Sequence, residues 1–122
     1  MTAAGAAGAA GTHRQLLLDA REAAEQRVAQ LRQEIQQLVA ATADANTDDE
    51  HDPEGPTIAY ERQQVAALLL AASRRLADLN QALAREATGG YGQCERCGQP
   101  IPPQRLAARP SATTCVVCAS PR

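Results

Sequence analysis

Apolar residues recur by threes and fours over two stretches of the chain, and this pattern predicts two long helices. The first stretch runs from residue 12 to about residue 41. Its apolar positions are Leu17, Ala24, Val28, Leu31, Ile35 and Leu38. The last four of these follow heptad steps of three, four and three, which are typical of a coiled-coil seam. We expect the helix to begin at Thr12, because "THRQ" has the hydroxyl and the glutamine of a capping box.

The second stretch continues the same spacing to Thr88. Its apolar positions are Ile58, Val65, Leu69, Ala72, Leu76, Leu79 and Leu83. Either Asp52-Pro53 or Gly55-Pro56 is expected to start this helix, since proline suits a first helical turn. Gly89-Gly90 is expected to end it, because glycine readily adopts the left-handed conformation that stops a helix.

Residues 42–57 separate the two stretches and are predicted to form a loop, because they contain two prolines, a glycine and a cluster of acids. A short loop between two helices gives an antiparallel hairpin, here over residues 12–88. The alternative is one long helix that pairs with a second chain, which the prolines and the glycine disfavour. Residues 1–11 consist mostly of Ala and Gly and are expected to be a disordered tail.

The composition agrees with helices that meet along a narrow seam. There is no Phe or Trp, and Tyr60 and Tyr91 are the two aromatic residues, so large rings cannot fill a core. The longest apolar run, residues 65–72, is too short to span a membrane. Residues 1–11 also lack the pattern of a secretory signal. We therefore expect a cytoplasmic protein without membrane association.

All four cysteines lie in the last quarter of the chain, as two pairs. Cys94 and Cys97 form one C-x2-C pair, Cys115 and Cys118 form the other, and 17 residues separate the pairs. Such pairs present two thiolates each to one ion, and this spacing is typical of a tetrahedral zinc site. A reducing compartment also favours metal ligation over structural disulfides. The sequence therefore predicts one structural zinc ion.

The cysteine pattern leaves two other interpretations open. The pairs could form a redox switch that makes disulfides when zinc is lost, or the same four thiolates could hold iron. Residues 89–122 contain few sizeable apolar groups, so this module needs a metal to fold. We expect the folded module to brace the open end of the hairpin.

Charge is unevenly distributed along a chain whose formal net charge is −2. Six of the fourteen acids lie between residues 44 and 54. A calcium loop starting at Asp44 is disfavoured, because Asp49 stands where such a loop needs glycine. The predicted hairpin instead carries these acids at its tip, where they could deliver negative charge to an electropositive or metal-containing place.

The segment "GGYGQCERCGQPIPPQRLAARPSATTCVVCA" resembles the zinc-finger signature of the DksA/TraR family. The resemblance includes Tyr91-Gly92 before the first cysteine, Arg105-Leu106 and Ala108-Arg109-Pro110, besides the two cysteine pairs. It covers about 30 residues. The resemblance implies an RNA polymerase-binding transcription regulator whose acidic-tipped coiled coil enters the secondary channel of the bacterial enzyme. Some members act together with the alarmone ppGpp, but the long C-terminal helix of larger members has no counterpart here, so we do not extend ppGpp sensitivity to this chain.

The resemblance also implies which acids face the polymerase active site. Members often carry D-x-x-D-x-A at the tip, and the nearest match here has Glu54 where the pattern has alanine. This departure leaves open both the essential acid and the direction of regulation. The candidate tip acids are Asp48, Asp49, Glu50, Asp52 and Glu54.

Three arginines of the module are candidate contacts to polymerase or to phosphate: Arg96, Arg105 and Arg109. They allow an alternative function as a zinc ribbon that binds nucleic acid or acts as an adaptor. DNA would repel the acidic tip, so we expect no sequence-specific DNA binding. The chain has no nucleophile–base pair and no open metal position, which argues against an enzyme. We expect it to act as a monomer.

Overall fold

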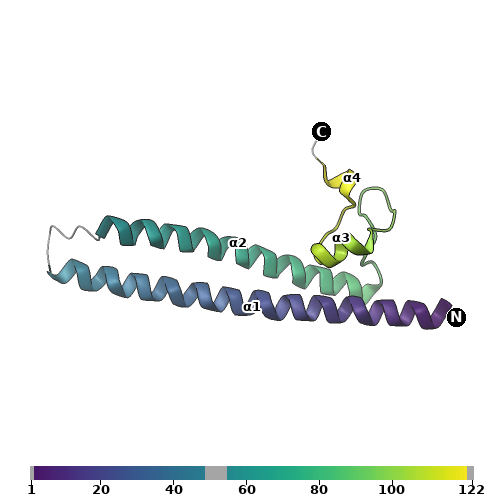
Figure 1. Cartoon of the computed structure of the whole chain (residues 1–122), viewed down its shortest axis with the longest axis horizontal. Coiled ribbons are helices and arrows are strands. Elements are labelled where there is room, and N and C mark those ends of the chain that lie inside the picture. Colours follow the sequence, from purple (N-terminus) through teal and green to yellow (C-terminus); the bar gives the residue numbers. More distant parts are fainter. Residues whose placement is uncertain (1, 49–54, 121–122) are drawn as a thin grey trace. The chain divides into compact units, whose positions relative to one another are not determined.

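The computed structural model describes the backbone of residues 2–48 and 55–120, and the side chains of residues 11–41, 43 and 56–120. This part of the chain contains four helices: α1 (Thr2–Asp48), α2 (Gly55–Thr88), α3 (Pro103–Ala108) and α4 (Val116–Ala119) (Figure 1). Its other residues form turns, extended segments and one isolated antiparallel bridge between Gln93 and Pro100. The predicted all-α class, a two-helix hairpin followed by a four-cysteine module, is confirmed.

The chain forms two compact units, each of which contains one stretch of α1 and one stretch of α2. The first unit comprises residues 1–23 and 75–122, and the second comprises residues 24–74. This division differs from the three consecutive segments expected from the sequence. The cysteine module and the end of the hairpin that carries it therefore form one compact unit.

The predicted seam is buried in both units. In the first unit, Leu17 of α1 and Leu79 of α2 have no exposed surface. In the second unit, Ala24, Val28 and Leu31 of α1 are buried. The remaining predicted seam positions are half-buried: Ile35, Leu38, Ile58, Val65, Leu69, Ala72, Leu76 and Leu83. The seam is therefore narrow, as two helices alone can enclose only one stripe of side chains.

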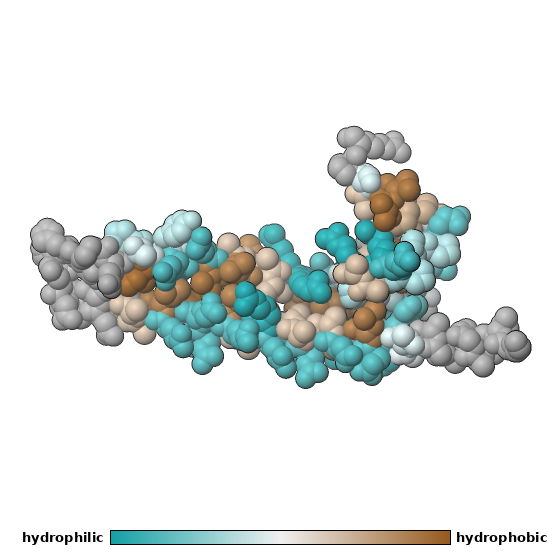
Figure 2. All heavy atoms as spheres, in the orientation of Figure 1, coloured by the Kyte–Doolittle hydropathy of each residue, from teal (hydrophilic) through white to brown (hydrophobic). Residues whose placement is uncertain are grey.

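Hydrophobic residues also remain on the surface of the long helices, where they are drawn in brown among the teal hydrophilic residues (Figure 2). The large ones in the second unit are Val39, Tyr60, Leu68 and Leu70. Ala82 of the first unit, in contrast, is fully buried although it is not one of the predicted seam positions. It lies three residues after Leu79 and so shares a face of α2 with it.

The first helix is longer than predicted at both ends. α1 includes residues 2–11, which the composition had predicted to be a disordered tail, so the predicted start at Thr12 is wrong. Alanine has the highest helix propensity, and the alanines of this stretch extend the helix despite three glycines. Gln15 does not act as part of a capping box; its side-chain amide donates to Asp19 Oδ1 at 2.8 Å, one turn along the helix.

At its other end α1 continues past the predicted stop at residue 41 to Asp48. α2 begins at Gly55, with Pro56 in its first turn, so the second of the two predicted starts is confirmed. Residues 49–54 lie outside the described residues, and so do the alternative start at Asp52-Pro53 and His51. Residues 42–48 and 55–57 of the predicted loop are therefore helical.

α2 ends where the two glycines predict. Gly89 has a φ of +83°, in the left-handed region that glycine adopts without a Cβ penalty. The amide of Gly90 donates to the carbonyl of Arg85 at 2.9 Å, and the amide of Gly89 donates to that of Glu86 at 3.2 Å. These two bonds form a Schellman motif, which satisfies carbonyls at the helix end and turns the chain into the cysteine module.

We predict that Leu79→Ala lowers the free energy of unfolding by about 2–5 kcal/mol, because it leaves a cavity in the seam of the first unit. Urea unfolding of the zinc-loaded protein, followed by far-UV circular dichroism, measures this change. The control is Leu70→Ala, which truncates a side chain of α2 that is 54% exposed and should change stability by less than about 0.5 kcal/mol. Equal losses in the two variants would contradict the seam assignment.

Candidate metal centre

The first cysteine pair lies on a tight hairpin directly after α2. The amide of Ile101 donates to Gly92 at 2.7 Å, the amide of Cys94 donates to Gln99 at 2.9 Å, and the amide of Gly98 donates to Cys94 at 2.9 Å. Gly98 has a φ of +76°, so a residue with a Cβ would be strained at this position. The turn that follows Cys97 therefore requires glycine at position 98.

The second pair lies where an irregular segment enters the short helix α4. Cys115 precedes α4 with extended backbone angles, and Cys118 lies within the helix. Between the two pairs, Pro103 starts α3 in a position where its missing amide donor costs nothing. α3 carries Leu106, which packs with Ile101 and Cys94 as the small buried core of the module.

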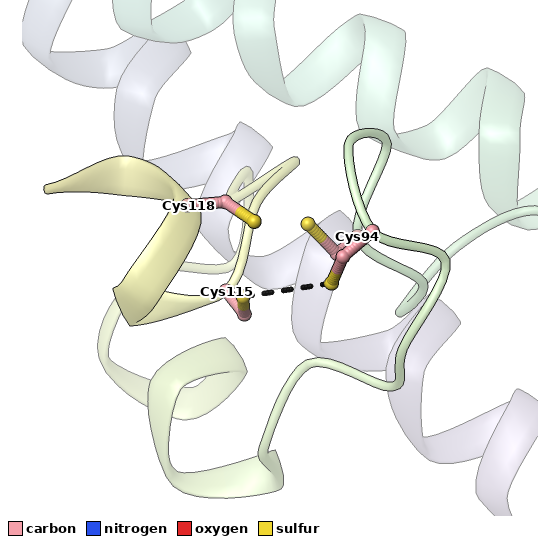
Figure 3. A group of neighbouring side chains, drawn as sticks. Cys94, Cys115 and Cys118 are labelled. Carbon is pink, nitrogen blue, oxygen red and sulfur yellow. Dashed lines mark hydrogen bonds between the residues drawn. The ribbon is translucent and has the colours of Figure 1, made fainter.

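The four sulfur atoms come together at one point. All lie within 4.8 Å of one another, and those of Cys97 and Cys115 are 3.8 Å apart. Figure 3 shows Cys94 facing Cys115 and Cys118 across this point from the opposite segment. In a tetrahedral site with Zn–S bonds of about 2.3 Å, sulfur atoms lie about 3.8 Å apart. The residues present therefore fit one zinc ion.

The thiols of this cluster differ in acidity. The pKa of the Cys94 thiol is lowered to about 6, chiefly because the backbone amides of Cys97 and then of Cys115 donate to its sulfur. The pKa of the Cys118 thiol is raised to about 12, because its protonated form donates hydrogen bonds to the sulfur of Cys115 and then to that of Cys94. A bound zinc ion supplies the positive charge that keeps all four sulfurs as thiolates.

Four thiolates complete the coordination of zinc and leave no position for a substrate or a water molecule. The site is therefore structural: it ties residues 94–97 to residues 115–118. The buried apolar core of the module is small, so this tie carries much of its stability.

Tyr91 links the cysteine module to α1 within the first unit. Its hydroxyl donates to the carbonyl of Pro110 at 2.8 Å, and its ring meets the ring of His13 edge-on, with centroids 5.1 Å apart. Burial raises the pKa of the Tyr91 hydroxyl, against the opposing effect of the nearby Arg85 charge. Neither role was predicted, since His13 carries no motif signal and Tyr91 stands out in the sequence only as part of the family pattern.

The three candidate arginines differ in their surroundings. Arg105 is half-buried, and its Nε donates to the carbonyl of Thr114 at 2.8 Å. Arg96 is exposed and makes a long bond of 3.4 Å to the carbonyl of Cys118. Arg109 is exposed. Two of the three arginines thus contact the segment that carries the second cysteine pair.

The structure does not describe the side chains of the candidate tip acids. Asp48 is the last residue of α1, and its side chain lies outside the described residues. Asp49, Glu50, Asp52 and Glu54 also lie outside them. Their role therefore stays a prediction from the sequence.

Comparisons with known proteins agree with the zinc site. Residues 88–122 match the family described as "Prokaryotic dksA/traR C4-type zinc finger". The solved structure of transcription factor DksA2 from Pseudomonas aeruginosa is similar, with a TM-score of 0.75 and 28% identity over 89% of this chain and 78% of that chain. The likeness to that structure thus extends well beyond the cysteine module.

Two curated relatives match over shorter stretches. An uncharacterized protein YteA of Bacillus subtilis (strain 168) is 41% identical over 66 residues, which are 54% of this chain and 28% of that protein. An uncharacterized protein of Aquifex aeolicus (strain VF5) is 46% identical over 44 residues, or 36% of this chain and 30% of that protein. The chain thus matches less than a third of the length of either relative.

None of the helices in the described part of the chain combines the length and the hydropathy that a membrane span needs.

We predict that Cys97→Ser abolishes stoichiometric zinc binding, because a hydroxyl replaces one of four thiolates. Zinc per chain is measured by atomic emission after gel filtration. The control is Gln99→Ser, which places the same side chain at an exposed neighbouring position and should keep one zinc ion. A Cys97→Ser protein that still carries one zinc per chain would refute the four-cysteine site.

Zinc affinity should fall as the pH falls, because protons compete with the metal for the thiolates. Each of the four thiols must be a thiolate to bind zinc, so below the ordinary thiol pKa of about 8.5 the affinity should fall steeply with each unit of pH. Competition with a chromophoric chelator at two pH values in this range measures the affinity. An affinity that does not change between them would contradict ligation by thiolates.

Proposed function

We propose that this chain, whose residues 88–122 form a zinc finger of the prokaryotic dksA/traR C4 type, is a transcription regulator that binds bacterial RNA polymerase. In this proposal the zinc finger holds the base of the helical hairpin, and the hairpin enters the secondary channel of the polymerase. The loop acids then act near the catalytic centre. The observation that carries the proposal is the four-cysteine cluster at the end of a two-helix hairpin, together with the similarity to transcription factor DksA2.

The helical arrangement supports delivery of charge to a distant place. In the second unit, residues 55–74 of α2 extend for about 30 Å at ~1.5 Å per residue, alongside α1. The connection between the two helices holds four of the candidate acids: Asp49, Glu50, Asp52 and Glu54. A polymerase active site contains Mg²⁺ and basic walls, both of which attract carboxylates.

The exposed basic surface of the module gives less support to nucleic-acid binding. Arg105 is half-buried and bonded to Thr114, so it is not a free surface charge. The net charge of −2 also gives the chain no overall attraction to a phosphate backbone. The proposed partner is therefore polymerase, bound by a monomer without sequence-specific contacts to DNA.

A binding titration tests the partner. Labelled protein is titrated with bacterial core RNA polymerase, with duplex DNA as competitor and with a ligand that fills the secondary channel as blocker. Saturable binding that DNA leaves intact and the channel ligand removes supports the proposal. Tight binding to DNA without affinity for polymerase would overturn it in favour of a nucleic-acid-binding zinc ribbon.

We predict that neutralising the tip acids impairs regulation more than it impairs binding. The variant replaces Asp49 and Asp52 with Asn and Glu54 with Gln, so it removes charge and nearly preserves side-chain volume. Its effect on the lifetime of promoter complexes is measured at saturating occupancy of polymerase. Most of the regulatory effect should be lost, because the acids act at the catalytic centre rather than at the docking surface.

The matched control for this variant removes three exposed acids of the helices, Glu22, Glu34 and Glu61, by substitution with Gln. It removes three negative charges, as the tip variant does, and should regulate as the unaltered protein does. If the tip variant regulates as strongly as this control, the loop acids have no role in the mechanism.

A further inference from the structure

The segment that leads to the second cysteine pair, residues 109–115, has little regular structure of its own. Between the end of α3 at Ala108 and the start of α4 at Val116, the backbone forms turns and extended stretches. Among the backbone bonds described for it, the amide of Ala112 donates to Arg109 at 3.0 Å within the segment. Groups elsewhere in the module must therefore help to fix where Cys115 lies.

Three donors from outside the segment hold its carbonyl groups. The Tyr91 hydroxyl binds the carbonyl of Pro110 at 2.8 Å. The amide of Glu95, next to the first zinc ligand, binds the carbonyl of Thr113 at 2.8 Å. Arg105 of α3 binds the carbonyl of Thr114, the residue before Cys115, at 2.8 Å. These bonds align the second ligand pair with the first.

Arg105 is the charged donor of the three, and the carbonyl that it binds is the one directly before Cys115. A hydrogen bond from a guanidinium is stronger than one between neutral groups. α3 fixes the origin of this side chain: Leu106, the next residue, is buried in the module core, and Pro103 starts the helix. The donor of this bond is therefore held by a helix, whereas the acceptor, Thr114, lies in a segment without regular secondary structure.

The donating atom is Nε, and a lysine has no donor at the corresponding position of its side chain. At the same place along a lysine side chain stands Cε, which cannot donate a hydrogen bond. Lysine would keep the positive charge at this position but not the N–H beside the aliphatic stem. A role that depends on charge alone and a role that depends on the Nε–H can therefore be separated by one substitution.

We propose that Arg105 is a positioning residue of the metal centre: by holding the Thr114 carbonyl, it sets the place of Cys115 and thereby the affinity of the site for zinc. The Tyr91 hydroxyl, on the Pro110 carbonyl, assists it from the other end of the segment. This assignment replaces the sequence-based hypothesis that Arg105 contacts polymerase or phosphate. The positioning role of Arg105 does not depend on polymerase binding, so its test is independent of the test of the proposed function.

The test measures the zinc affinity of the full chain by competition with a chromophoric chelator. Arg105→Gln and Arg105→Lys should both bind zinc roughly 10-fold more weakly, the lower end of the effect of losing a group that orients a metal ligand. Far-UV circular dichroism at saturating zinc should show unchanged helix content, because the seam of the hairpin is not altered. A purely structural role would instead reduce helix content and zinc affinity together.

Two controls match the substitution. Gln104→Ala alters the neighbouring exposed position of α3, and Arg75→Gln removes an equal charge from an exposed position of α2 in the same unit. Both should bind zinc as the unaltered protein does. If Arg105→Lys keeps full affinity, or if either control loses as much as Arg105→Gln, the proposal is wrong.

A second variant keeps the proposal testable if Arg105→Gln does not fold. Tyr91→Phe removes only the hydroxyl that binds Pro110 and keeps the ring against His13. Zinc affinity should fall in this variant too, by less than in the arginine variants, because the lost bond is neutral and lies further from Cys115. An affinity equal to that of the unaltered protein would overturn the claim that these carbonyl contacts position the ligand.

Discussion

The convergence of four sulfur atoms on one point is the constraint on which the C-terminal part of this protein depends. Among the described residues of the module, the buried core cluster is Cys94, Ile101 and Leu106, and one of these three is itself a zinc ligand. So small a core cannot offset the conformational entropy of ordering some thirty residues. Metal ligation replaces the missing apolar burial, and it does so by tying two segments that lie far apart in sequence.

The same constraint reaches the helices through contacts within the first unit. The Schellman motif at Gly89 and Gly90 ends α2 immediately before the module. Tyr91 then joins the Pro110 carbonyl to the ring of His13 on α1. Arg14 of α1 and Glu86 of α2 form an ion pair of 3.5 Å in the same unit, although the pair contributes little because the Arg14 side chain is 57% exposed. Metal, module and the base of the hairpin thus form one connected set of contacts.

Features that depend on local chemistry were predictable from the sequence. The cysteine spacing identified all four ligands, and the glycine pair marked the end of α2. The apolar repeat predicted the buried seam positions, among them Leu17, Leu31 and Leu79, which are fully buried. These signals are reliable for the same reason. Each depends on a few neighbouring residues or on a strict periodicity, so contacts with distant parts of the chain rarely change the outcome.

Other features depended on competition or on tertiary contacts, and the sequence did not reveal them. The predicted start of α1 was wrong because the helix propensity of the preceding alanines outweighs the capping pattern at Thr12. The burial of Ala82 was not predicted, because alanine also stands at exposed positions of α2 such as Ala66 and Ala84 and so does not by itself mark the buried face. The Arg105 bond to Thr114 joins residues whose proximity is set by the folded module, so composition suggested only a surface charge.

Amide hydrogen exchange on the zinc-loaded and the chelator-stripped protein tests the role of the metal most directly. If zinc supplies the stability of the module, removal should expose the amides of Cys94, Glu95 and Ile101, which are hydrogen-bonded in the folded module. The amides of the helices around Leu17 and Leu79 should stay protected, because the seam buries them independently of the metal. Module amides that remain as protected without zinc as with it would show that the small core suffices, and would contradict the dependence of the module on its four cysteines.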